Sequence, residues 1–348
     1  MADLTRRRPT MTDVAARAGV SLKTVSRVIN GVTTVDEGMA SRVRAAAGEL
    51  GFRPNQMAAT LKSGAATAMI GLVIKDIANE FYASITQGAA EVAAQRGVQL
   101  ITSSTTDEDV SDESELATIF ELCRRRADGL IIVPRGHDQS PLAREIEMGT
   151  PMVFVDRAPV DLDADAVVLD NVGGARAVVE ALIAQGHRRI GMVFDSLEIA
   201  TMRERRDGAV AALRAHGLDV GDDLLRAETH GPGASASAVA SLLDSADPPT
   251  AVFCGNNRAT IGAVEEIWRR QTDVAIGGID DFHLAHLMPI SLTLGAYDAT
   301  ELGRQAARLL FSRIDGHRGP GRREKLPIVV RSSGIPPHDN PRHTQENR

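Results

Sequence analysis

The sequence has few of the features that mark membrane, secreted or metal-binding proteins. Its 348 residues contain no apolar run near the roughly 20 residues that a membrane helix needs, so we expect no membrane partner. The first residues are polar and rich in arginine, with no apolar segment behind them, so we expect no secretion signal. Cys123 and Cys254 form no CxxC pair, which predicts buried thiols of a cytosolic protein and neither a zinc site nor disulfides.

Motifs of the common enzyme classes are missing as well. The sequence has no GxGxxG after a strand, no P-loop lysine motif, no GxSxG and no HExxH. His187, in GHRRIG, falls where a helix meets a strand, and we interpret it as structural. We therefore predict that the protein is not an enzyme and has no catalytic residue, metal or cofactor.

What the sequence does contain is a globular mixture with an uneven charge. Hydrophobic residues make up 43% and charged residues 24%, enough for a sizeable core, and the length indicates more than one domain. Residues 1–62 carry ten Lys and Arg against five Asp and Glu, whereas the remainder carries 29 against 41. This indicates a cationic head that contacts a polyanion and an anionic body that does not. A chance basic tail is the alternative, since Arg6, Arg7 and Arg8 supply three of the charges.

The segment that starts at Thr10, TMTDVAARAGVSLKTVSRVIN, predicts two short helices joined by a tight turn. Thr10 and Asp13 have the spacing of a capping box, and apolar residues follow at helical intervals. Gly19 ends the first helix, where a left-handed residue costs little. Ser21 is a suitable N-cap for the second helix, and so short a turn forces the two helices to cross steeply.

The second helix has an apolar back and a basic front. Leu22, Lys23 and Arg27 share the face opposite the apolar residues, which predicts a recognition helix that reads base edges in a major groove. Hydroxyl and amide groups nearby are suited to phosphate oxygens: Thr10, Ser21, Thr24, Ser26 and Asn30. An ordinary amphipathic hairpin is the alternative that periodicity alone leaves open.

The string DVAARAGVSLKTVSRVING resembles the N-terminal signature of the lactose-repressor (LacI/GalR) family almost position for position. The similarity continues through a third helix, Asp36 to about Leu50, and then GFRPN. It implies that Leu22, Lys23 and Arg27 occupy base-reading positions. Gly38 departs from the family's usual polar residue and, as a poor helix former, predicts a small loss of stability.

Residues 54–67 are predicted to form a hinge helix and linker. Asn55, Ala58 and Leu61 fall on neighbouring turns of a helix too short to be stable alone. The resemblance implies that this helix folds on operator DNA and inserts Leu61 into a minor-groove step, as apolar wedges that kink DNA do. A plain linker with Leu61 docked on the body is the alternative.

From Ala68 onward, short apolar strands alternate with helical stretches, which predicts parallel sheets covered on both faces. Strands are expected in two groups: 69–74, 98–102, 128–134 and 151–156, then 189–194, 250–255 and 274–280. Gly71, Gly88 and Gly97 recur 120 residues later as Gly191, Gly208 and Gly217, which indicates a duplicated lobe. The predicted fold is an all-α helix-turn-helix head on a two-lobed α/β domain that is similar to periplasmic sugar-binding proteins.

Ligands of such sheets bind at the carboxyl ends of strands, so the residues there are candidates for an effector site between the lobes. The resemblance implies carboxylate, amide and guanidinium contacts with a polar ligand and an aromatic wall. The candidates are Phe81, Asp156, Arg203, Arg205, Asn256 and Asp280. Alternatively, an Asp at a strand end caps the next helix, and Phe81 belongs to the core.

Three departures from the family pattern fall at this cleft. NEFY replaces the usual NPFF and places Glu80 at the cleft edge, while GNN replaces AND, so that Asn257 stands in for an Asp. Residues 230–235, HGPGAS, fall where many relatives have an aromatic that stacks on a sugar, and only 3% of the chain is aromatic. A sugar or sugar derivative is still the first expectation for the effector.

The predicted domains are a head at 1–53, the hinge and linker at 54–67, an effector domain at 68–335 and a disordered tail at 336–348. Within the effector domain, the first lobe is assigned to about 68–164 with 298–322, and the second lobe to about 165–297 with 323–335. No leucine heptad follows, so a homodimer on a pseudo-palindromic operator is expected.

These patterns together predict a cytoplasmic, nucleoid-associated transcriptional regulator, a repressor by expectation, controlled by a small molecule. A transport binding protein would share the two lobes, but it would need a signal peptide and would lack residues 10–62. DNA binding that weakens steeply with salt would separate a regulator from this rival and from an enzyme.

Overall fold

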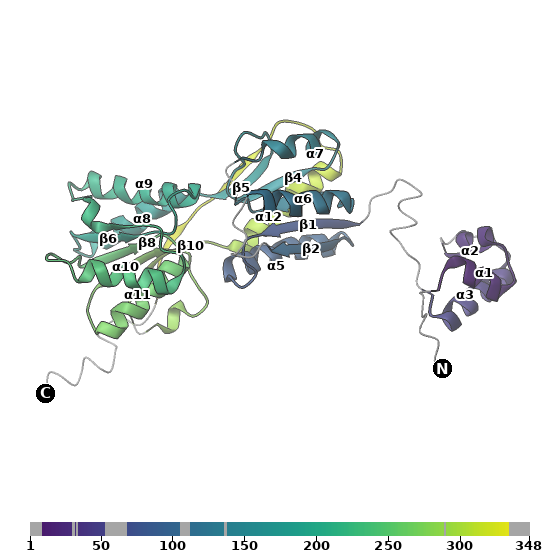
Figure 1. The fold of residues 1–348 in the computed structure, drawn as a ribbon, viewed down its shortest axis with the longest axis horizontal. Helices are drawn as coiled ribbons and strands as arrows, with labels where there is room; N and C mark the ends of the chain where they lie inside the picture. Colours follow the sequence, from purple (N-terminus) through teal and green to yellow (C-terminus); the bar gives the residue numbers. More distant parts are fainter. Residues whose placement is uncertain are drawn as a thin grey trace. The chain divides into compact units, whose positions relative to one another are not determined.

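The computed structural model describes residues 9–29, 32, 34–52, 68–104, 112–135, 138–288 and 290–333. The chain divides into two compact units, Met1–Thr67 and Ala68–Arg348, which we call the head and the body. Figure 1 shows the helices of the head and the two lobes of the body. Each unit is considered by itself.

The described part of the head contains three packed helices, α1 (Met11–Ala18), α2 (Leu22–Ile29) and α3 (Glu37–Leu50). The predicted capping box is confirmed, because the Thr10 side chain accepts from the Asp13 backbone N–H and the Asp13 carboxylate accepts from the Thr10 N–H. Gly19 ends α1 in the left-handed conformation, and Ser21 Oγ accepts from the Thr24 N–H at the start of α2. The three helices enclose a small core of Val14, Ala15, Ala18, Val25, Val43 and Ala46.

The first lobe of the body is built on a six-stranded sheet in which all strands are parallel, in the order β11-β5-β4-β3-β1-β2. Its strands are β1 (Met69–Ile74), β2 (Gln99–Ser104), β3 (Leu130–Ile132), β4 (Met152–Asp156), β5 (Asp165–Leu169) and β11 (Arg323–Leu326). Its helices are α5 (Glu80–Gln95), α6 (Asp112–Arg124), the short turn η1 (Ser140–Leu142), α7 (Ala143–Glu147) and α12 (Ala299–Ile314).

Helices cover both faces of this sheet, as the continuous apolar strands predicted. Along β1, Leu72 belongs to the core shared with α5 and α12, while its neighbour Val73 belongs to the core shared with α6. Because successive side chains of a strand point to opposite faces, a strand buried on both faces must be apolar throughout.

The second lobe repeats this plan, with the order β12-β10-β9-β8-β6-β7. The edge strand β12 is antiparallel to β10, and the other strands are parallel. The strands are β6 (Ile190–Val193), β7 (Leu225–Arg226), β8 (Ala251–Cys254), β9 (Ala275–Ile279), β10 (Leu292–Ala296) and β12 (Val329–Ser333). The helices are α8 (Asn171–Ala184), α9 (Ala200–Ala215), α10 (Pro232–Leu243) and α11 (Asn257–Arg270), with the short turns η2 (Asp222–Leu224) and η3 (Ala285–Leu287).

The sheet pairing corrects the predicted division between the lobes. Residues 165–169 and 323–326 were assigned to the second lobe, but as β5 and β11 they pair with each other and extend the first sheet. The chain therefore crosses between the lobes after β5, after β10 and between β11 and β12. The prediction failed because it set the boundary before residue 165, although the apolar strand that starts there pairs with β4.

The predicted duplication is visible in the topology, because β1 and β6 occupy equivalent places in the two sheets. The repeated glycines have equivalent roles. A Cβ on Gly88 of α5 would lie 1.9 Å from the carbonyl oxygen of Thr300 in α12, and one on Gly208 of α9 would lie 2.2 Å from that of Val172 in α8. Each glycine thus allows two helices to pack backbone against backbone.

We predict that Gly88→Ala destabilises the body by roughly 1–3 kcal/mol or more, because its methyl group would overlap backbone that cannot move independently. Gly233→Ala is the matched control, since a Cβ there meets nothing within 4 Å. The control should leave the stability unchanged or raise it by about 0.4–1 kcal/mol. Urea unfolding of the full chain measures both, and equal midpoints for the two variants would contradict the packing described for α5 and α12.

Candidate functional site

The second helix of the head presents a mixed apolar and basic surface to solvent. Val25 is completely buried in the head core, whereas Lys23 and Arg27 are exposed and the Leu22 side chain is 51% exposed. The Arg27 guanidinium donates a hydrogen bond to the Thr34 hydroxyl. The structure therefore brings the three predicted base-reading side chains to the surface of one short, capped helix.

The hydroxyls predicted for phosphate contacts also serve the local fold. Thr10 belongs to the capping box, and Ser21 Oγ lies 2.9 Å from Thr24 Oγ1 at the first turn of α2. Ser26, one turn further along, is half-buried. A hydroxyl that already makes one hydrogen bond keeps further capacity to donate or accept, so both roles are compatible.

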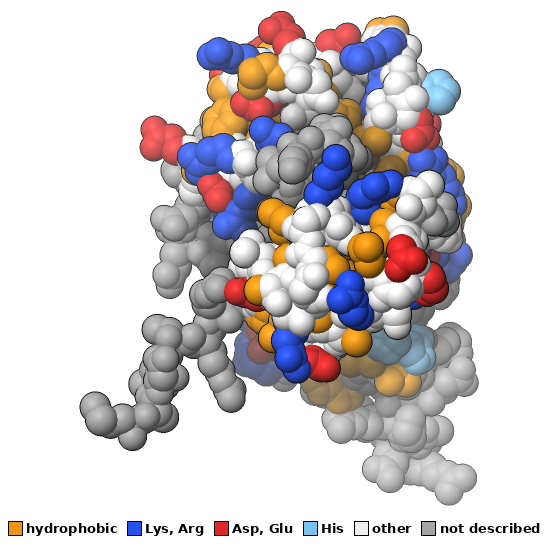
Figure 2. Space-filling model, turned by 90° about the vertical axis from the view of Figure 1, so that its right-hand side faces the viewer, with side chains coloured by type: hydrophobic (Ala, Val, Ile, Leu, Met, Phe, Trp, Pro, Cys, Tyr) orange, Lys and Arg blue, Asp and Glu red, His pale blue; other side chains and the backbone are white. Residues whose placement is uncertain are grey.

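The remaining predicted DNA contacts, Asn30, Asn55, Ala58 and Leu61, lie outside the described residues. On the side of the molecule drawn in Figure 2, Lys and Arg side chains are dispersed among apolar and uncharged ones.

In the body, a cleft between the lobes holds most of the predicted effector residues. Its inner part is a cavity of about 60 Å³. The first lobe lines it with side chains that follow β1 and β4, and the second lobe lines it with residues that follow β6, β8 and β9. Five of the six candidates line this cavity: Phe81, Asp156, Arg205, Asn256 and Asp280.

Asp280 is held by contacts from three directions. It follows β9 and forms an ion pair with the buried guanidinium of Arg205 at 3.3 Å. The hydroxyl of Tyr297 donates to it at 2.6 Å, and the backbone N–H of Asn257 donates at 3.3 Å. Burial alone would lower the pKa of Arg205, but the neighbouring carboxylate of Asp280 holds that pKa above its ordinary value.

Asp156 holds the equivalent place in the first lobe, directly at the end of β4. Asp156 and Asp280 both have a left-handed backbone, with φ of 71° and 74°. Burial raises the pKa of the Asp156 carboxyl, although Arg157 lies 3.3 Å away. The Arg157 atom that faces Asp156 is its buried Nε, which forms this ion pair but no hydrogen bond with the described residues.

Three aromatic side chains form one wall of the inner cavity. Phe81 packs edge-to-face against Tyr82 and Tyr297, with ring centroids 5.1 Å and 6.1 Å apart. Burial raises the pKa of Tyr82 to about 12 and that of Tyr297 well above its usual range, so both hydroxyls stay protonated at neutral pH. Phe81 therefore lines the cavity beside the chain's two tyrosines and also packs against the core, while its contact with a ligand stays a prediction.

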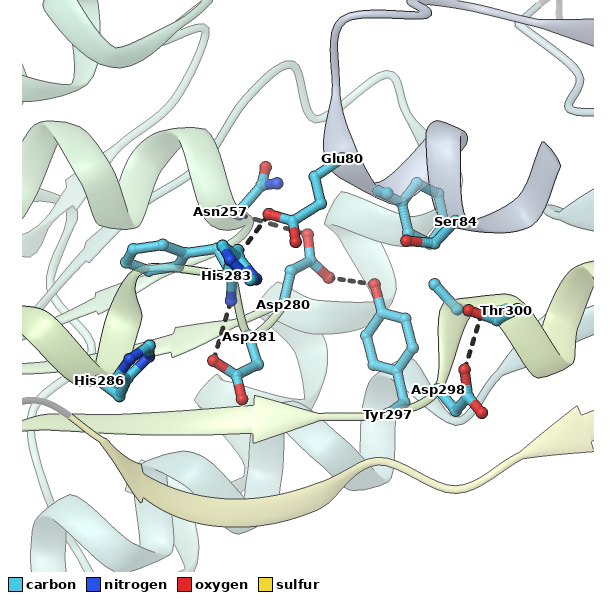
Figure 3. Close-up of a pocket in the computed structure, with 13 residues that line it drawn as sticks. Glu80, Ser84, Asn257, Asp280, Asp281, His283, His286, Tyr297, Asp298 and Thr300 are labelled. Atoms are coloured by element: carbon cyan, nitrogen blue, oxygen red, sulfur yellow. Dashed lines mark hydrogen bonds between the residues drawn. The ribbon is translucent and has the colours of Figure 1, made fainter. Parts of the chain in front are cut away.

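The cleft continues outward into a larger cavity of about 330 Å³, which Figure 3 shows. Glu80 and Ser84 project into it from α5, opposite residues that follow β9. A carboxylate oxygen of Glu80 accepts the backbone N–H of His283 at 3.0 Å and so connects the two lobes. Glu80 thus lies at the cleft edge, where the sequence predicted it.

Two further contacts bridge the lobes beside this cavity. The guanidinium of Arg258 forms an ion pair with Asp76, which follows β1. The side chain of Asn257 donates to Asn79 Oδ1 at 3.2 Å. These two contacts tie the loop after β1 to the start of α11, while Glu80 ties the start of α5 to the segment after β9.

Arg203 is the candidate that the structure does not bring to the cleft. Its exposed side chain donates to the backbone carbonyls of Leu197 and Glu198, at the turn before α9. Arg205 lies two residues further along the same helix and points the opposite way, into the cleft. Asn256 has both of the roles considered for such residues: it lines the cavity and caps α11 by accepting from the Ala259 N–H.

Four residues of the site were not predicted from the sequence: Asp76, Asn171, Arg258 and Tyr297. Asn171 Oδ1 accepts from Arg205 at 2.9 Å and so fixes its guanidinium. Tyr297 had one usable signal, because it is one of only two tyrosines and falls between a strand and a helix. The pairing of Asp76 with Arg258 joins residues 182 positions apart and leaves no local pattern.

Two features are absent from the described part of the chain. Within the described ranges, His, Cys, Asp and Glu form no cluster that could hold a metal ion. None of the described helices has the length and apolar character needed to cross a membrane. In place of a stacking aromatic at 230–235, His230 Nδ1 lies 2.6 Å from Asp195 Oδ1, and Asp195 lines the cleft.

A three-helix head with an exposed basic helix, on a two-lobed body with a polar cleft, defines a ligand-responsive DNA-binding protein. Comparison with known families agrees with this class. Residues 10–55 match the family described as bacterial regulatory proteins, lacI family. Residues 67–343 match periplasmic binding proteins and sugar binding domain of LacI family. The chain belongs to the LacI family and is a DNA-binding transcriptional regulator with an effector domain; members of this family are not enzymes.

Individual relatives are similar over nearly their whole length. The ribose operon repressor of Escherichia coli (strain K12) is 31% identical over 310 residues, which cover 88% of this chain and 93% of that protein. The HTH-type transcriptional regulator PtxS of Pseudomonas plecoglossicida is 31% identical over 335 residues, covering 94% and 96%. A structure of the lac repressor dimer bound to operator and the anti-inducer ONPF has a TM-score of 0.79 at 26% identity, covering 93% and 98%.

The geometry of the cleft predicts a large difference between two arginines of α9. Arg205→Ala should destabilise the body by roughly 3–5 kcal/mol, because it leaves the Asp280 carboxylate buried without its ion-pair partner. Arg203→Ala, on the exposed side of the same helix, should change the stability by less than about 1 kcal/mol. Urea unfolding of the full chain measures the difference; a comparable loss from both variants would show that Arg205 does not support Asp280.

Proposed function

We propose that the protein is a repressor that binds a pseudo-palindromic operator as a homodimer and responds to a sugar or sugar derivative in the cleft. The observation that carries the proposal is the exposed Lys23 and Arg27 on a capped, two-turn helix whose opposite face is buried. That arrangement fits the recognition helix of a helix-turn-helix protein. Such a regulator acts in the cytoplasm, where bacterial DNA lies.

In this proposal Leu22, Lys23 and Arg27 contact base edges in the major groove. Lys and Arg suit the acceptors of guanine, and Leu22 suits the methyl group of thymine. Phosphate contacts come from the hydroxyl and amide groups at the helix ends, which fix the position of the helix without reading the sequence. These are Thr10, Ser21, Thr24, Ser26 and Asn30. Residues 54–67, with Asn55, Ala58 and Leu61, act as the hinge that enters the minor groove.

The effector site is proposed to be the cleft formed by Phe81, Asp156, Arg205, Asn256 and Asp280. Carboxylate, guanidinium and amide groups beside an aromatic wall offer paired donors and acceptors for hydroxyl groups. One related structure, 29% identical and with a TM-score of 0.67, is a complex of the transcriptional regulator CelR with cellobiose. A sugar is therefore the first ligand to test.

A homodimer is proposed because two heads are needed to read two half-sites. The second lobe exposes several large apolar side chains, among them Ile261, Leu284 and Leu287, at 40%, 50% and 59% exposure. The related lac repressor is described as a dimer on its operator.

The proposed mechanism couples the cleft to the head. A ligand that contacts both lobes favours one relative position of the lobes and so changes whether the two hinge segments of the dimer can pair on DNA. A coupling free energy of about 1–3 kcal/mol is sufficient. Whether the ligand releases DNA or promotes binding depends on which position binds DNA better.

We predict that Arg27→Ala lowers the preference for the selected operator over random DNA by about 1–3 kcal/mol, roughly 5- to 150-fold. The operator is first selected from a random duplex library with the full chain, and both affinities are then measured by fluorescence anisotropy. Arg44→Ala is the control, because it removes the same charge from α3, where Arg44 pairs with Glu37. An equal loss of affinity for operator and random DNA in Arg27→Ala would exclude a base-reading role.

A further inference from the structure

The first strand of the body starts at one edge of the first sheet. The loops at this edge form a single connected surface. All six strands of this sheet are parallel, so the loops before their amino ends meet at one edge. Contacts between distant loops confirm this: Ala68 accepts the Gln99 N–H at 2.8 Å, and Arg96 pairs with Asp315 at 2.8 Å. Asp165 in turn accepts the Arg322 N–H at 2.8 Å.

This edge is rich in exposed arginine, although the body as a whole is acidic. Among the described residues, the exposed arginines in these loops and at the adjoining element ends are Arg96, Arg124, Arg125, Arg126, Arg318, Arg322 and Arg323, which we call the basic edge. Exposed carboxylates there are fewer: Glu147, Asp161, Asp163 and Asp315. The basic edge therefore contrasts with the balance of 29 basic and 41 acidic residues beyond residue 62.

Most acidic groups near the basic edge already have partners. Asp165 is buried beneath it and holds Arg313 at 2.8 Å. Glu121 pairs with Arg124 and Arg125. Among the described residues, Arg318 and Arg323 form no ion pair.

The equivalent edge of the second lobe has the opposite character. The loops before β6, β7, β8 and β9 carry exposed aspartates: Asp219, Asp222, Asp223, Asp244, Asp247 and Asp273. Arg189 lies within 4 Å of Asp219, Asp223 and Asp247. Because the carboxyl ends of both sheets face the cleft, the two amino-end edges lie at opposite ends of the body. The two lobes share one fold, so the difference belongs to the side chains and not to the architecture.

The basic edge is also the one to which the DNA-binding head is tethered. The body begins at Ala68, and residues 53–67 connect it to the head. Fifteen residues span at most about 50 Å when fully extended. The linker thus limits how far a duplex held by the head can move from this edge, which raises the effective concentration of the duplex there.

We propose that the basic edge of the first lobe is a second DNA contact, which binds phosphates of the duplex beside the site held by the head. Arginine is suited to this role because its guanidinium donates two hydrogen bonds to one phosphate and stays charged. This inference rests on the proposed function, since it requires the head to bind DNA. It changes the initial expectation that the anionic body takes no part in that binding.

The test compares two double variants of the full chain that lose equal charge. Arg318→Ala/Arg323→Ala removes the two unpaired arginines of the basic edge. Arg188→Ala/Arg214→Ala removes two exposed arginines from the corresponding edge of the second lobe, where they form no ion pair with described residues. Affinity for a random 60-base-pair duplex is measured by fluorescence anisotropy at several salt concentrations, after unfolding curves confirm that both variants are folded.

Each phosphate contact contributes roughly 0.9 to the slope of log affinity against log salt. In the proposed homodimer, the basic-edge variant should therefore lose about 1.8 from the slope for each subunit whose edge contacts the duplex, up to about 3.6, while the second-lobe variant keeps the slope of the unmodified chain. Equal slopes for all three proteins would overturn the proposal and leave DNA binding by the head intact. Failure of the unmodified chain to bind any duplex would instead contradict the proposed function itself.

Discussion

The ion pair between Arg205 and Asp280 is the interaction on which the cleft depends. Both groups are almost completely buried, and a buried charge without a partner is strongly destabilising. The surrounding side chains are explained by this constraint: Asn171 and the Gly255 carbonyl accept from Arg205, while Tyr297 donates to Asp280. A network of this kind leaves polar atoms fixed in position and ready for a ligand.

Tyr297 gives that network a connection to the movement of the lobes. It lies between β10 and α12, where the chain crosses from the second lobe to the first. Its hydroxyl holds Asp280, and its ring contacts Phe81 of the first lobe. A ligand that competes for Asp280 therefore acts on the crossing segment as well as on the cleft. This is the physical route by which we expect ligand binding to reach the first lobe, to which the head is attached.

Features that depend on neighbouring residues, or on the spacing at which residues repeat along the chain, could be predicted from the sequence. The capping box of Thr10 and Asp13, the left-handed Gly19 and the buried strand β1 all follow local rules. The equivalence of Gly88 and Gly208 was recognisable from their spacing, but its cause was not. Only the structure shows that each glycine lies against the backbone of another helix.

Features that depend on contacts between distant parts of the chain could not be predicted from the sequence. Which sheet β5 and β11 join depends on pairing partners far along the sequence, and the ion pair of Asp76 with Arg258 joins the two lobes. Arg203 and Arg205 were both named as candidates because both open the same helix. Two residues along a helix correspond to a turn of about 200°, so only one of the two could face the cleft, and the sequence did not fix which.

The central claim, that ligand in the cleft and DNA on the head affect each other, is tested most directly by measuring both affinities. Ribose and cellobiose are screened first by thermal shift, and the affinity for selected operator is then compared with and without the sugar that binds. The account predicts a change of about 5- to 150-fold, matched by an equal change in sugar affinity when operator is present. Asp280→Asn should retain operator binding and lose this response. A sugar that saturates the body and leaves operator affinity unchanged would contradict the account.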